Sequence, residues 1–526
     1  MKTKNVLMIV IAFALTGLSA KAQLKFQKCI GGALGDDYGN CIQQTADSGY
    51  IIAGYTTSFG AGNYDVYLIK LDANGDTSWT KTYGDTLNDM ANFVRQTRDG
   101  GYIIAGQTYN YGAGEYDMLV IKTDASGDTM WTKVYGHPYN DNATSIEQTS
   151  DGGYIVGGTM DIGGLGYLEA ALMKLDSVGN VAWIRLFSYL YNFVANDVHQ
   201  TSDGGYILVG SAIYSNYNHV YMVKTDASGD TLWTKYYGGG GQDWGNQIQQ
   251  TSDNGFVIIG ETTSFGAGSG DVYVIKTDSL GLALWSKVYG STNVDVGYSI
   301  KQTPDGGYIL GGVSQSFGPN PVNCYLIKIN SSGIPAWSKI YGGSGSSFGY
   351  SVDITTDGGY VLAGNNTGLG AGGSDVYIIK TDGLGSSGCI DSSVTTVYST
   401  PQTQLLTNVT SIDSVVNAAT AAPFINHGGT VSDLCNNVGI KEIVSKIGIS
   451  LAPNPFTTQT ILTLQGTYNN PSLFIYNLLG QEVRNIAVGT NSQITINREH
   501  LACGMYFYKL IDENKEVIGI GKMIAE

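Results

Sequence analysis

The stretch DGGYIIAG at Asp99–Gly106 decides the fold, because almost the same eight letters occur seven times in the chain. The other copies are DSGYIIAG at Asp47, DGGYIVGG at Asp151, DGGYILVG at Asp203, DNGFVIIG at Asp253, DGGYILGG at Asp305 and DGGYVLAG at Asp357. The Tyr or Phe of one copy follows that of the copy before it by 50 or 52 residues. A fixed period near fifty residues indicates a propeller or a repeat array.

Each unit contains four short strand patterns, rich in β-branched and aromatic residues and bounded by Gly, Asp, Asn or Ser. In the second unit they are Phe93–Thr97, Gly101–Thr108, Asp117–Thr123 and Met130–Tyr135. A tryptophan opens the fourth pattern in six units, at Trp79, Trp131, Trp183, Trp233, Trp285 and Trp337. Four strands in about fifty residues are typical of one propeller blade.

The seventh unit lacks its tryptophan and ends after VYIIKTD at Val376–Asp382. The stretch FQKCIG at Phe26–Gly31 has the missing form, with Phe26 at the Trp position and Lys28 at the Lys position. The N-terminal strand is therefore predicted to complete the last blade, and closure removes exposed sheet edges. The sequence predicts a seven-bladed β-propeller over residues 24–388, loosely similar to kelch repeats.

The second glycine of the repeated motif is present in all seven copies, at Gly49, Gly101, Gly153, Gly205, Gly255, Gly307 and Gly359. Because no copy accepts a side chain there, we expect a positive φ at this position. The preceding position tolerates Ser48 and Asn254, so less strain is expected there.

The first 22 residues have the pattern of a signal peptide. Lys2 and Lys4 precede the apolar stretch Val6–Leu15, and Ala20-Lys21-Ala22 fits a cleavage site. No other segment is apolar enough to span a bilayer. The formal net charge of −16 argues against nucleic acid or an anionic membrane as a partner.

The repeat ends before residues 389–446, which are rich in Ser and Thr and poor in charge. We expect a linker or a small β extension there. Six cysteines are present and none has the CxxC spacing of a metal site. Since Cys389 and Cys435 bracket this segment and an exported protein can form disulfides, we predict that they pair.

Residues 447–526 contain seven further strand patterns, which indicate a small, immunoglobulin-like β-sandwich. The patterns are Ile449–Leu451, Thr460–Leu464, Leu473–Tyr476, Glu482–Ile486, Gln493–Ile496, Met505–Leu510 and Val517–Met523. The ordered stretches LAPNPF, LFIYNLLGQEV, GMYFYKL and GKMIAE resemble the C-terminal sorting domain of the bacterial type IX secretion system. The residues on the family's motif positions are Pro453, Asn454, Pro455, Gly480, Gly504, Tyr506 and Lys522.

This resemblance implies a route for the chain. The type IX machinery would be its partner, the signal peptide and the sorting domain would be removed, and the protein would be released or held on the outer-membrane surface. The resemblance implies nothing about the activity of the repeat domain.

Acidic residues recur at two places that the expected strand order puts on one face, opposite the DGGYIIAG hairpins. One set precedes the first strand, at Asp37, Asp89, Asp141, Asp243 and Asp295. The other opens the third strand, at Asp65, Asp117, Glu169, Asp271 and Asp375. Two interpretations stand: the carboxylates bind Ca²⁺ or sugar hydroxyls, or they accept hydrogen bonds from their own loops.

The acids recur in most units, which favours the second interpretation, because a ligand site usually breaks the symmetry of a repeat. A unique pocket is therefore expected where the units diverge, as at Ser188–Asp197 and Ala212–His219. No GxSxG, HExxH or P-loop pattern is present. The leading hypothesis is a ligand-binding or adhesion protein for a glycan or a protein, without catalytic residues, metal or cofactor, Ca²⁺ excepted. The alternatives are an extracellular carbohydrate-active hydrolase using two propeller carboxylates, and a structural surface protein.

Overall fold

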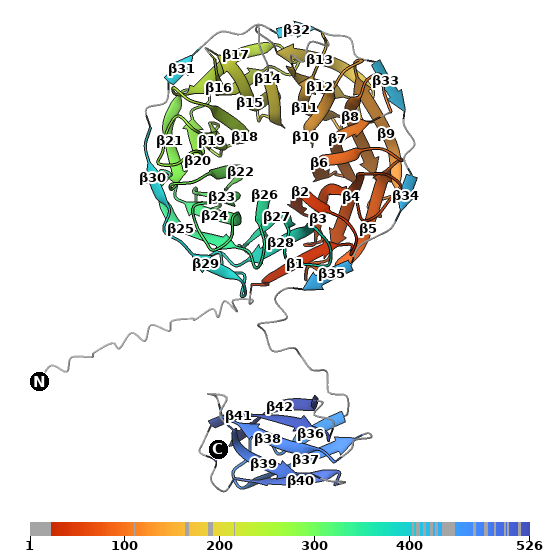
Figure 1. Cartoon of the computed structure of the whole chain (residues 1–526), viewed down its shortest axis with the longest axis vertical. Helices are drawn as coiled ribbons and strands as arrows, with labels where there is room; N and C mark the ends of the chain where they lie inside the picture. Colours follow the sequence, from red (N-terminus) through yellow and green to blue (C-terminus); the bar gives the residue numbers. More distant parts are fainter. Residues whose placement is uncertain are drawn as a thin grey trace, which may run out of the picture. The chain divides into compact units, whose positions relative to one another are not determined.

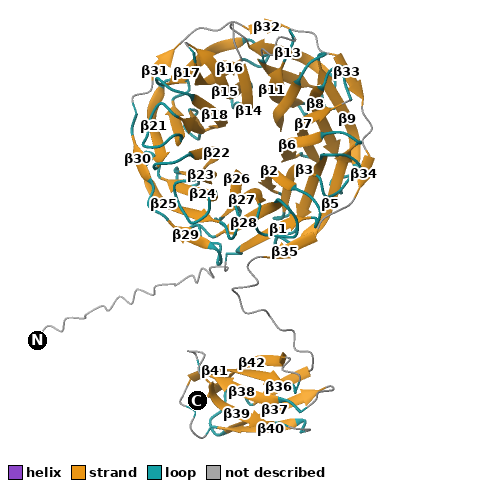
Figure 2. Ribbon diagram, viewed as in Figure 1, coloured by secondary structure: helices purple, strands orange, loops and turns teal. Residues whose placement is uncertain are grey.

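The computed structural model describes residues 23–525 apart from 110, 164–167, 188–192, 215, 402–403, 407–410, 414–416, 421–423, 427–429, 434–447, 466–469, 478–481, 489–490, 499–500, 502–503 and 514–516. All regular elements in the described residues are strands, which confirms the all-β prediction (Figure 2). Contacts divide the chain into two compact units, Met1–Cys435 and Asn436–Glu526. The described residues include no helix long and apolar enough to cross a membrane. The predicted signal peptide lies outside them.

In the described part of the first unit, seven antiparallel sheets of five strands stand around a common centre (Figure 1). Each sheet is named here by its innermost strand. The β2 sheet holds β2 (Asp37–Gln44), β3 (Tyr50–Thr56), β4 (Asp65–Leu71), β5 (Thr77–Gly84) and β34 (Phe424–Asn426). The β6 sheet holds β6 (Asp89–Gln96), β7 (Tyr102–Tyr109), β8 (Tyr116–Thr123), β9 (Thr129–Gly136) and β33 (Asn417–Thr420).

The next sheets repeat this arrangement. The β10 sheet holds β10 (Asp141–Gln148), β11 (Tyr154–Met160), β12 (Glu169–Leu175), β13 (Val181–Phe187) and β32 (Ser411–Asp413). The β14 sheet holds β14 (Phe193–Gln200), β15 (Tyr206–Tyr214), β16 (Tyr217–Thr225), β17 (Thr231–Gly238) and β31 (Gln404–Leu406). The β18 sheet holds β18 (Asp243–Gln250), β19 (Phe256–Thr262), β20 (Asp271–Thr277), β21 (Ala283–Gly290) and β30 (Val397–Ser399).

The last two sheets bring the chain back to its start. The β22 sheet holds β22 (Asp295–Gln302), β23 (Tyr308–Ser314), β24 (Asn323–Ile329), β25 (Pro335–Tyr341) and β29 (Asp391–Ser393). The β26 sheet holds β26 (Ser347–Ile354), β27 (Tyr360–Asn366), β28 (Asp375–Thr381), β1 (Phe26–Gly31) and β35 (Thr430–Asp433). The architecture is that of a β-propeller.

The repeated motif is the hairpin between the first and second strands. Asp99 Oδ1 accepts hydrogen bonds from Thr97 Oγ1 at 2.5 Å and from the Gly101 amide at 3.0 Å. Its Oδ2 forms an ion pair with Lys122 Nζ on the third strand at 2.9 Å. The equivalent ion pair recurs in all seven sheets. The motif aspartate therefore ties each turn to the middle of its own sheet.

The expected positive φ of the second glycine is wrong, and the structure gives another reason for that glycine. Positive φ falls on the first position, at 84° for Gly100, 67° for Ser48 and 62° for Asn254. A Cβ on Gly101 would lie 2.1 Å from the Thr123 carbonyl oxygen. The second glycine is invariant within the chain because the third strand passes too close for any side chain.

The N-terminal strand β1 pairs with β28, from Phe26 opposite Lys380 to Ile30 opposite Val376. Phe26 packs against Gly75 of the β2 sheet, where an added Cβ would lie 2.5 Å from the ring. Trp79 packs in the same way against Gly127 of the β6 sheet, at 2.8 Å. Phe26 thus makes, between the β26 and β2 sheets, the contact that the tryptophans make between other neighbouring sheets.

The segment after the repeats contributes one short outer strand to every sheet (Figure 1). These strands, β29 to β35, are called the belt here. They visit the sheets in reverse order, from β29 on β25 to β35 on β1. The described strands of the segment expected to form a linker or a small extension therefore cover the outer edge of every sheet.

The cysteines fall into two groups. Cys29, Cys41 and Cys324 are free and buried. Cys389, just before the belt, is disulfide-bonded. Its predicted partner Cys435 lies outside the described residues.

The second unit contains two sheets. One holds β36 (Gly448–Ala452), β37 (Gln459–Gln465) and β40 (Gln493–Asn497), and the other holds β39 (Glu482–Ala487), β38 (Ser472–Tyr476), β41 (Gly504–Ile511) and β42 (Val517–Ala525). A single apolar cluster with Leu462, Leu473 and Leu510 joins them. All seven strand patterns of the sequence coincide with these strands to within two residues at each end.

Candidate functional site

The first set of predicted site residues lies at the inner strands and is buried. Asp37, Asp89, Asp141 and Asp243 open β2, β6, β10 and β18, and Asp295 opens β22, each exposed by at most 1%. Asp37 shows the pattern: its Oδ2 accepts hydrogen bonds from the Gly32 amide and from Ser58 Oγ, both at 2.8 Å, and its Oδ1 accepts one from Thr56 Oγ1. These bonds are local, within the first two strands and their loops.

The second set opens the third strands and is also held by backbone amides. Asp65, Asp117, Asp271 and Asp375 are buried, and Glu169 is partly buried. Asp271 Oδ2 accepts hydrogen bonds from the amides of Ala267 and Gly268, each at 3.1 Å. The geometry of both sets favours the interpretation in which the carboxylates order their own loops.

The two sets meet in pairs between neighbouring sheets, on either side of a glycine. A Cβ on Gly136 would lie 1.9 Å from Asp117 Oδ1 and 2.6 Å from Asp141 Oδ2. The same arrangement occurs at three other junctions, with Asp65 and Asp89 around Gly84, Asp271 and Asp295 around Gly290, and Asp375 and Asp37 around Gly31. The glycine is required because two carboxylates occupy the space of its side chain.

Burial and the facing carboxylates raise the pKa values of these pairs. Desolvation is the main cause for Asp141, with a smaller contribution from the charge of Asp117, and its pKa rises to about 7. The pKa of Asp89 rises to about 6 for the same reasons, with Asp65 among the nearby charges. Burial and a facing carboxylate thus favour the protonated form of one member of such a pair.

The three remaining junctions keep at most one acid of the pair. His219 faces Asp243 at 3.9 Å between Nδ1 and Oδ2. Asn323 and Ser347 are the residues at the junction of the β22 and β26 sheets. At the junction of the β10 and β14 sheets, the buried Phe193 stands in place of the aspartate while Glu169 opens β12, and residue 188, at the position of the glycine, lies outside the described residues. Within the described residues, no three His, Cys, Asp or Glu side chains are grouped as metal ligands.

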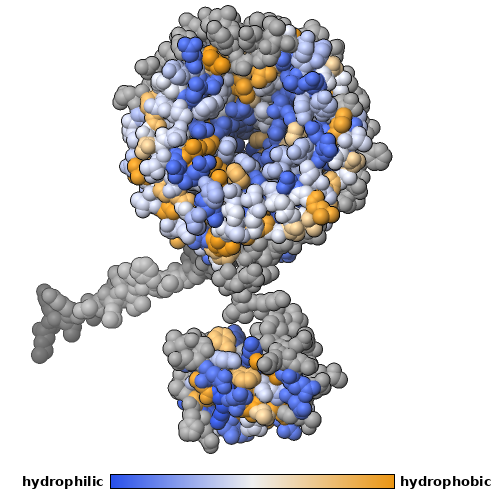
Figure 3. Space-filling view, viewed as in Figure 1, coloured by the Kyte–Doolittle hydropathy of each residue, from blue (hydrophilic) through white to orange (hydrophobic). Residues whose placement is uncertain are grey.

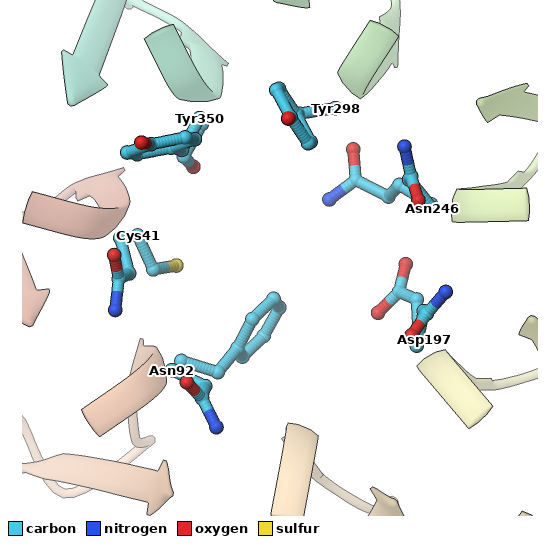
Figure 4. A pocket seen from close by; sticks show the side chains of 11 residues that line it. Cys41, Asn92, Asp197, Asn246, Tyr298 and Tyr350 are labelled. Carbon is cyan, nitrogen blue, oxygen red and sulfur yellow. The ribbon is translucent and has the colours of Figure 1, made fainter. Parts of the chain in front are cut away.

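A different set of residues lines the centre of the ring, where a pocket of about 300 Å³ opens (Figure 4). Its mouth is formed by the residue at which each inner strand bulges. Asn40, Asn92, Asn196 and Asn246 donate side-chain amide hydrogen bonds of 2.8–2.9 Å to a carbonyl of the next inner strand. Each asparagine therefore ties one sheet to its neighbour at the rim of the channel.

Three bulge positions lack an asparagine. One is Thr144 of β10, whose Oγ1 donates to the Ala195 carbonyl at 2.8 Å, and the other two are tyrosines. Tyr298 and Tyr350 stand at the bulge positions of β22 and β26, and their rings are 5.4 Å apart. Both are partly exposed and line the pocket. Figure 4 shows them on one side of the opening, with Asn246 and Asp197 on another. The space-filling view shows the centre of the ring hollowed, with hydrophilic residues around the opening (Figure 3).

The next layer of the channel carries one residue from each inner strand. Five residue types share these seven positions, because Ser recurs at Ser145, Ser299 and Ser351. Cys41, Phe93, Asp197, Gln247 and Ser351 line the pocket. Several also bond across sheets: Asp197 Oδ1 accepts a hydrogen bond from Ser145 Oγ at 2.7 Å. Gln247 Oε1 accepts one from the amide of Ile300 at 2.7 Å.

The layer below is charged. Its residues are Gln43, Arg95, Glu147, His199, Gln249, Lys301 and Asp353. His199 lies between two carboxylates, with Nδ1 3.0 Å from Glu147 Oε2 and Nε2 3.1 Å from Asp197 Oδ2. Although burial lowers it, these two acids raise the pKa of His199 to about 9, so the ring is protonated at neutral pH.

The pattern of repeats contained a signal for this channel. The turns, the third-strand lysines and the tryptophans hardly vary between units, whereas the residues one and three positions before the end of each inner strand vary strongly. Asp197 ends the divergent stretch Ser188–Asp197, so part of the channel lies in a segment for which the sequence predicted a unique pocket. Periodicity alone did not tell which face of the inner strand meets the channel.

The sorting motif of the second unit also has defined contacts. Asn454 Oδ1 accepts a hydrogen bond from the Ile524 amide at 2.8 Å, and its Nδ2 donates to the Lys522 carbonyl at 3.2 Å. Pro453 and Pro455 flank this residue, and Tyr506 is buried in the core of the unit. Gly504 has a φ of 152°. Gly480 lies outside the described residues.

Solved structures with similar folds are distant in sequence. The WD40 domain of Pan2 from Neurospora crassa is 12% identical with a TM-score of 0.41, over 66% of this chain and 89% of that one. Sqt1 from Chaetomium thermophilum is 11% identical with a TM-score of 0.35, over 65% and 83%. The regulatory protein FlaEY of Caulobacter vibrioides is 28% identical over 175 residues, which are 28% of this chain and only 18% of that protein.

The C-terminal unit has a clear relative. Residues 450–526 match the family model of the secretion system C-terminal sorting domain, which confirms the resemblance seen in the sequence. That domain marks a protein for the type IX secretion system. The chain is therefore a type IX cargo, destined for the cell surface or the extracellular space, with a propeller-like domain ahead of a C-terminal sorting domain.

Proposed function

We propose that the first unit is a seven-bladed β-propeller, closed by its N-terminal strand, that binds an extracellular glycan at the mouth of its central channel without catalysis. The pairing of β1 with β28 and the contact of Phe26 with Gly75 support the closure. An immunoglobulin-like sandwich follows as the sorting domain. The belt, closed by a Cys389–Cys435 disulfide, encircles the propeller.

The observation that carries this proposal is the contrast between a repeated frame and a divergent channel. Seven nearly identical hairpins and ion pairs build the ring. The channel layers hold Asn, Tyr, Asp, Gln, Ser, Phe and Cys in no repeated order. Structural repetition needs no such variety, whereas a site for one asymmetric ligand does.

The chemistry of the channel mouth suits a sugar. Its lining combines amides, a carboxylate and hydroxyls with the partly exposed rings of Tyr298 and Tyr350. Amides and hydroxyls bond to sugar hydroxyls, and an aromatic face packs against the apolar face of a pyranose. A pocket of about 300 Å³ is at the small end of ligand sites and fits one or two sugar rings.

A glycan array with the exported protein tests this proposal. We expect binding to at least one glycan class by the wild type and a loss of at least tenfold with Tyr350→Ala. Tyr139→Ala is the matched control, because Tyr139 is 43% exposed and lies outside the channel lining. A control that loses binding as strongly as Tyr350→Ala would contradict the assignment of the site to the channel.

The carbohydrate-active hydrolase remains the alternative, and the same preparation tests it. The ring carboxylates proposed as its catalytic acids are buried, Glu169 excepted, and Asp37 and Asp271 show how they accept hydrogen bonds from their own loops. Release of reducing sugar from bound glycans would establish turnover. Turnover that stops with Asp141→Asn would overturn the non-catalytic proposal.

Export by the type IX system is tested separately from binding. Removal of residues 450–526 should leave the propeller in the periplasm, whereas the full chain should reach the surface or the medium. Fractionation of producing cells measures this. Surface delivery of the shortened protein would show that the route does not depend on the sorting domain.

A further inference from the structure

We propose that the channel carries an anion-binding subsite, formed by Arg95 and Lys301 below the tyrosine-lined mouth, which takes the carboxylate or sulfate group of an acidic glycan. This inference rests on the proposed function and names the class of glycan.

Lys301 holds in β22 the position that Arg95 holds in β6 and His199 holds in β14, within the charged layer of the channel. It stands on β22, and its charge interacts with Arg95, Asp353 and Asp197, which come from three other inner strands. Burial and the charge of Arg95 lower its pKa. No carboxylate of the described residues lies within ion-pair distance of the Lys301 ammonium, and no described residue accepts a hydrogen bond from it.

Arg95 stacks on Phe93, which lines the pocket. The centre of its guanidinium is 4.1 Å from the centre of the Phe93 ring. Its Nη1 donates to the Val94 carbonyl at 3.1 Å and lies 3.5 Å from Cys41 Sγ. Phe93 and Cys41 both line the pocket, so a ligand in the pocket is separated from Arg95 by one layer of atoms. Among the described residues, no carboxylate forms an ion pair with Arg95.

The acids of the channel are engaged elsewhere. Asp353 accepts hydrogen bonds from the amides of Gln44 and Ile354, each at 3.0 Å. Glu147 accepts one from the Gln200 amide at 3.0 Å and holds His199 together with Asp197. Asp197 Oδ2 also accepts a hydrogen bond from the Ile248 amide at 3.1 Å. The charge of Arg95 helps to lower the pKa of Glu147, and the charges of Asp353 and Asp197 act to raise that of Lys301, yet none of these carboxylates forms an ion pair with Arg95 or Lys301 among the described residues.

Two cations that face each other in a confined space repel, and an anion between them removes that cost. Arginine offers a planar pair of donors that matches a carboxylate or a sulfate, and lysine adds a mobile ammonium. The tyrosines and amides at the mouth would hold the sugar ring while its acidic group points down the channel. An acidic sugar satisfies both layers, and a neutral one satisfies only the upper layer.

Isothermal titration with sodium sulfate and with sodium glucuronate, at constant ionic strength in sodium chloride, tests the subsite. We expect both to bind the wild type, and Lys301→Met and Arg95→Met each to weaken binding at least tenfold. Lys235→Met is the matched control, because Lys235 lies over Trp233 on an outer strand and should leave binding unchanged. Lys301→Gln serves in place of Lys301→Met should the latter not fold.

The outcomes separate this inference from the proposed function. The subsite is overturned if the wild type binds neither sulfate nor glucuronate, or if Lys301→Met binds them with the same affinity as the wild type. The second outcome is that neutral glycans bind, that Tyr350→Ala weakens this binding and that Lys301→Met does not change it. This outcome leaves the proposed function standing and refutes the subsite. Sulfate binding that depends on Lys301, with no glycan retained on an array, supports the subsite and refutes the glycan function.

Discussion

The carboxylates of Asp117 and Asp141 face each other across the Cα of Gly136, although they belong to different sheets. Burial and the neighbouring charge raise the pKa of Asp141 from its ordinary value of 3.8 to about 7. In the unfolded chain Asp141 loses its proton near pH 4, whereas in the folded protein it keeps it. Its contribution to stability is therefore full below pH 4 and is lost as the pH rises to about 7.

We predict that Asp141→Asn flattens this pH dependence. Between pH 4 and pH 7.5 the unfolding free energy of the wild type should fall relative to that of the variant, by at least about 1 kcal/mol. Urea denaturation at a series of pH values measures it. A difference that stays constant over this range would show that the pair carries no shared proton.

Asp99→Asn is the control with the opposite sign. Although burial raises it, the hydrogen bonds from Lys122 and Thr97 bring the pKa of Asp99 down to about 2. Its contribution is present above pH 4 and disappears as the pH falls through 2. The variant should therefore lose stability relative to the wild type at neutral pH and regain it in acid.

The closure of the ring predicts a large effect at Phe26. Its side chain is only 4% exposed and fills the space over Gly75. Phe26→Ala should lower the unfolding free energy by roughly 3 kcal/mol, whereas Phe26→Trp restores the residue of the other units and should be tolerated. Chemical denaturation measures both variants. Met130→Ala, at a residue 59% exposed, is the neutral control. Equal stability of Phe26→Ala and the wild type would mean that β1 does not hold the ring.

The two motif glycines predict opposite tolerances. Gly100 has a φ of 84° and nothing near its absent side chain, so Gly100→Asn should cost less than about 1 kcal/mol, as Asn254 occupies the same position. Gly101→Ala forces a Cβ to within 2.1 Å of the Thr123 oxygen and should cost roughly 2 kcal/mol or more. Thermal melting ranks them. The reverse order would refute the assignment of close approach to the second glycine.

The belt predicts a dependence on its disulfide. Cys389 is bonded, and the register of β35 on β1 places Asp433 opposite Lys28, two residues before Cys435. Gln27 Nε2 donates to the Ile390 carbonyl at 3.1 Å, so both ends of the belt reach β1. Non-reducing peptide mapping should find Cys389 linked to Cys435, and Cys389→Ser should cost roughly 2–4 kcal/mol. A peptide that links Cys389 to Cys503 would refute this pairing.

The repeat predicted the frame of the molecule because its residues are fixed by local chemistry. A turn that needs Asp99 and Gly101, and a strand rich in Ile and Val, look the same in every unit, so periodicity finds them. The N-terminal strand was visible for the same reason, since Phe26 and Lys28 keep the spacing of the missing pattern.

The belt and the channel were harder to predict for physical reasons. A belt strand bonds through its backbone to an existing edge and needs no distinctive side chains, so residues 389–446 resemble a linker in sequence. The residues of the channel are set by what lies across the ring. Arg95 and Lys301 are 206 positions apart, and only the closed ring brings their charges into interaction.

The two acidic sets illustrate the limit of repetition as a sign of function. Asp117 and Asp141 recur because each orders a loop and shares one inter-sheet junction with the other. Their regular spacing in the sequence reflects the frame. The junction of the β10 and β14 sheets, where the buried Phe193 replaces the aspartate, shows that the frame tolerates an apolar residue at one position of the pair.

The central claim is that the ligand enters the channel of the ring. Titration of a glycan selected on the array, with the wild type, Tyr350→Ala and Tyr139→Ala compared side by side, tests this claim most directly. The account predicts that the Tyr350→Ala dissociation constant rises at least tenfold while that of Tyr139→Ala stays within twofold of the wild type. Equal affinities of the wild type and Tyr350→Ala would contradict it.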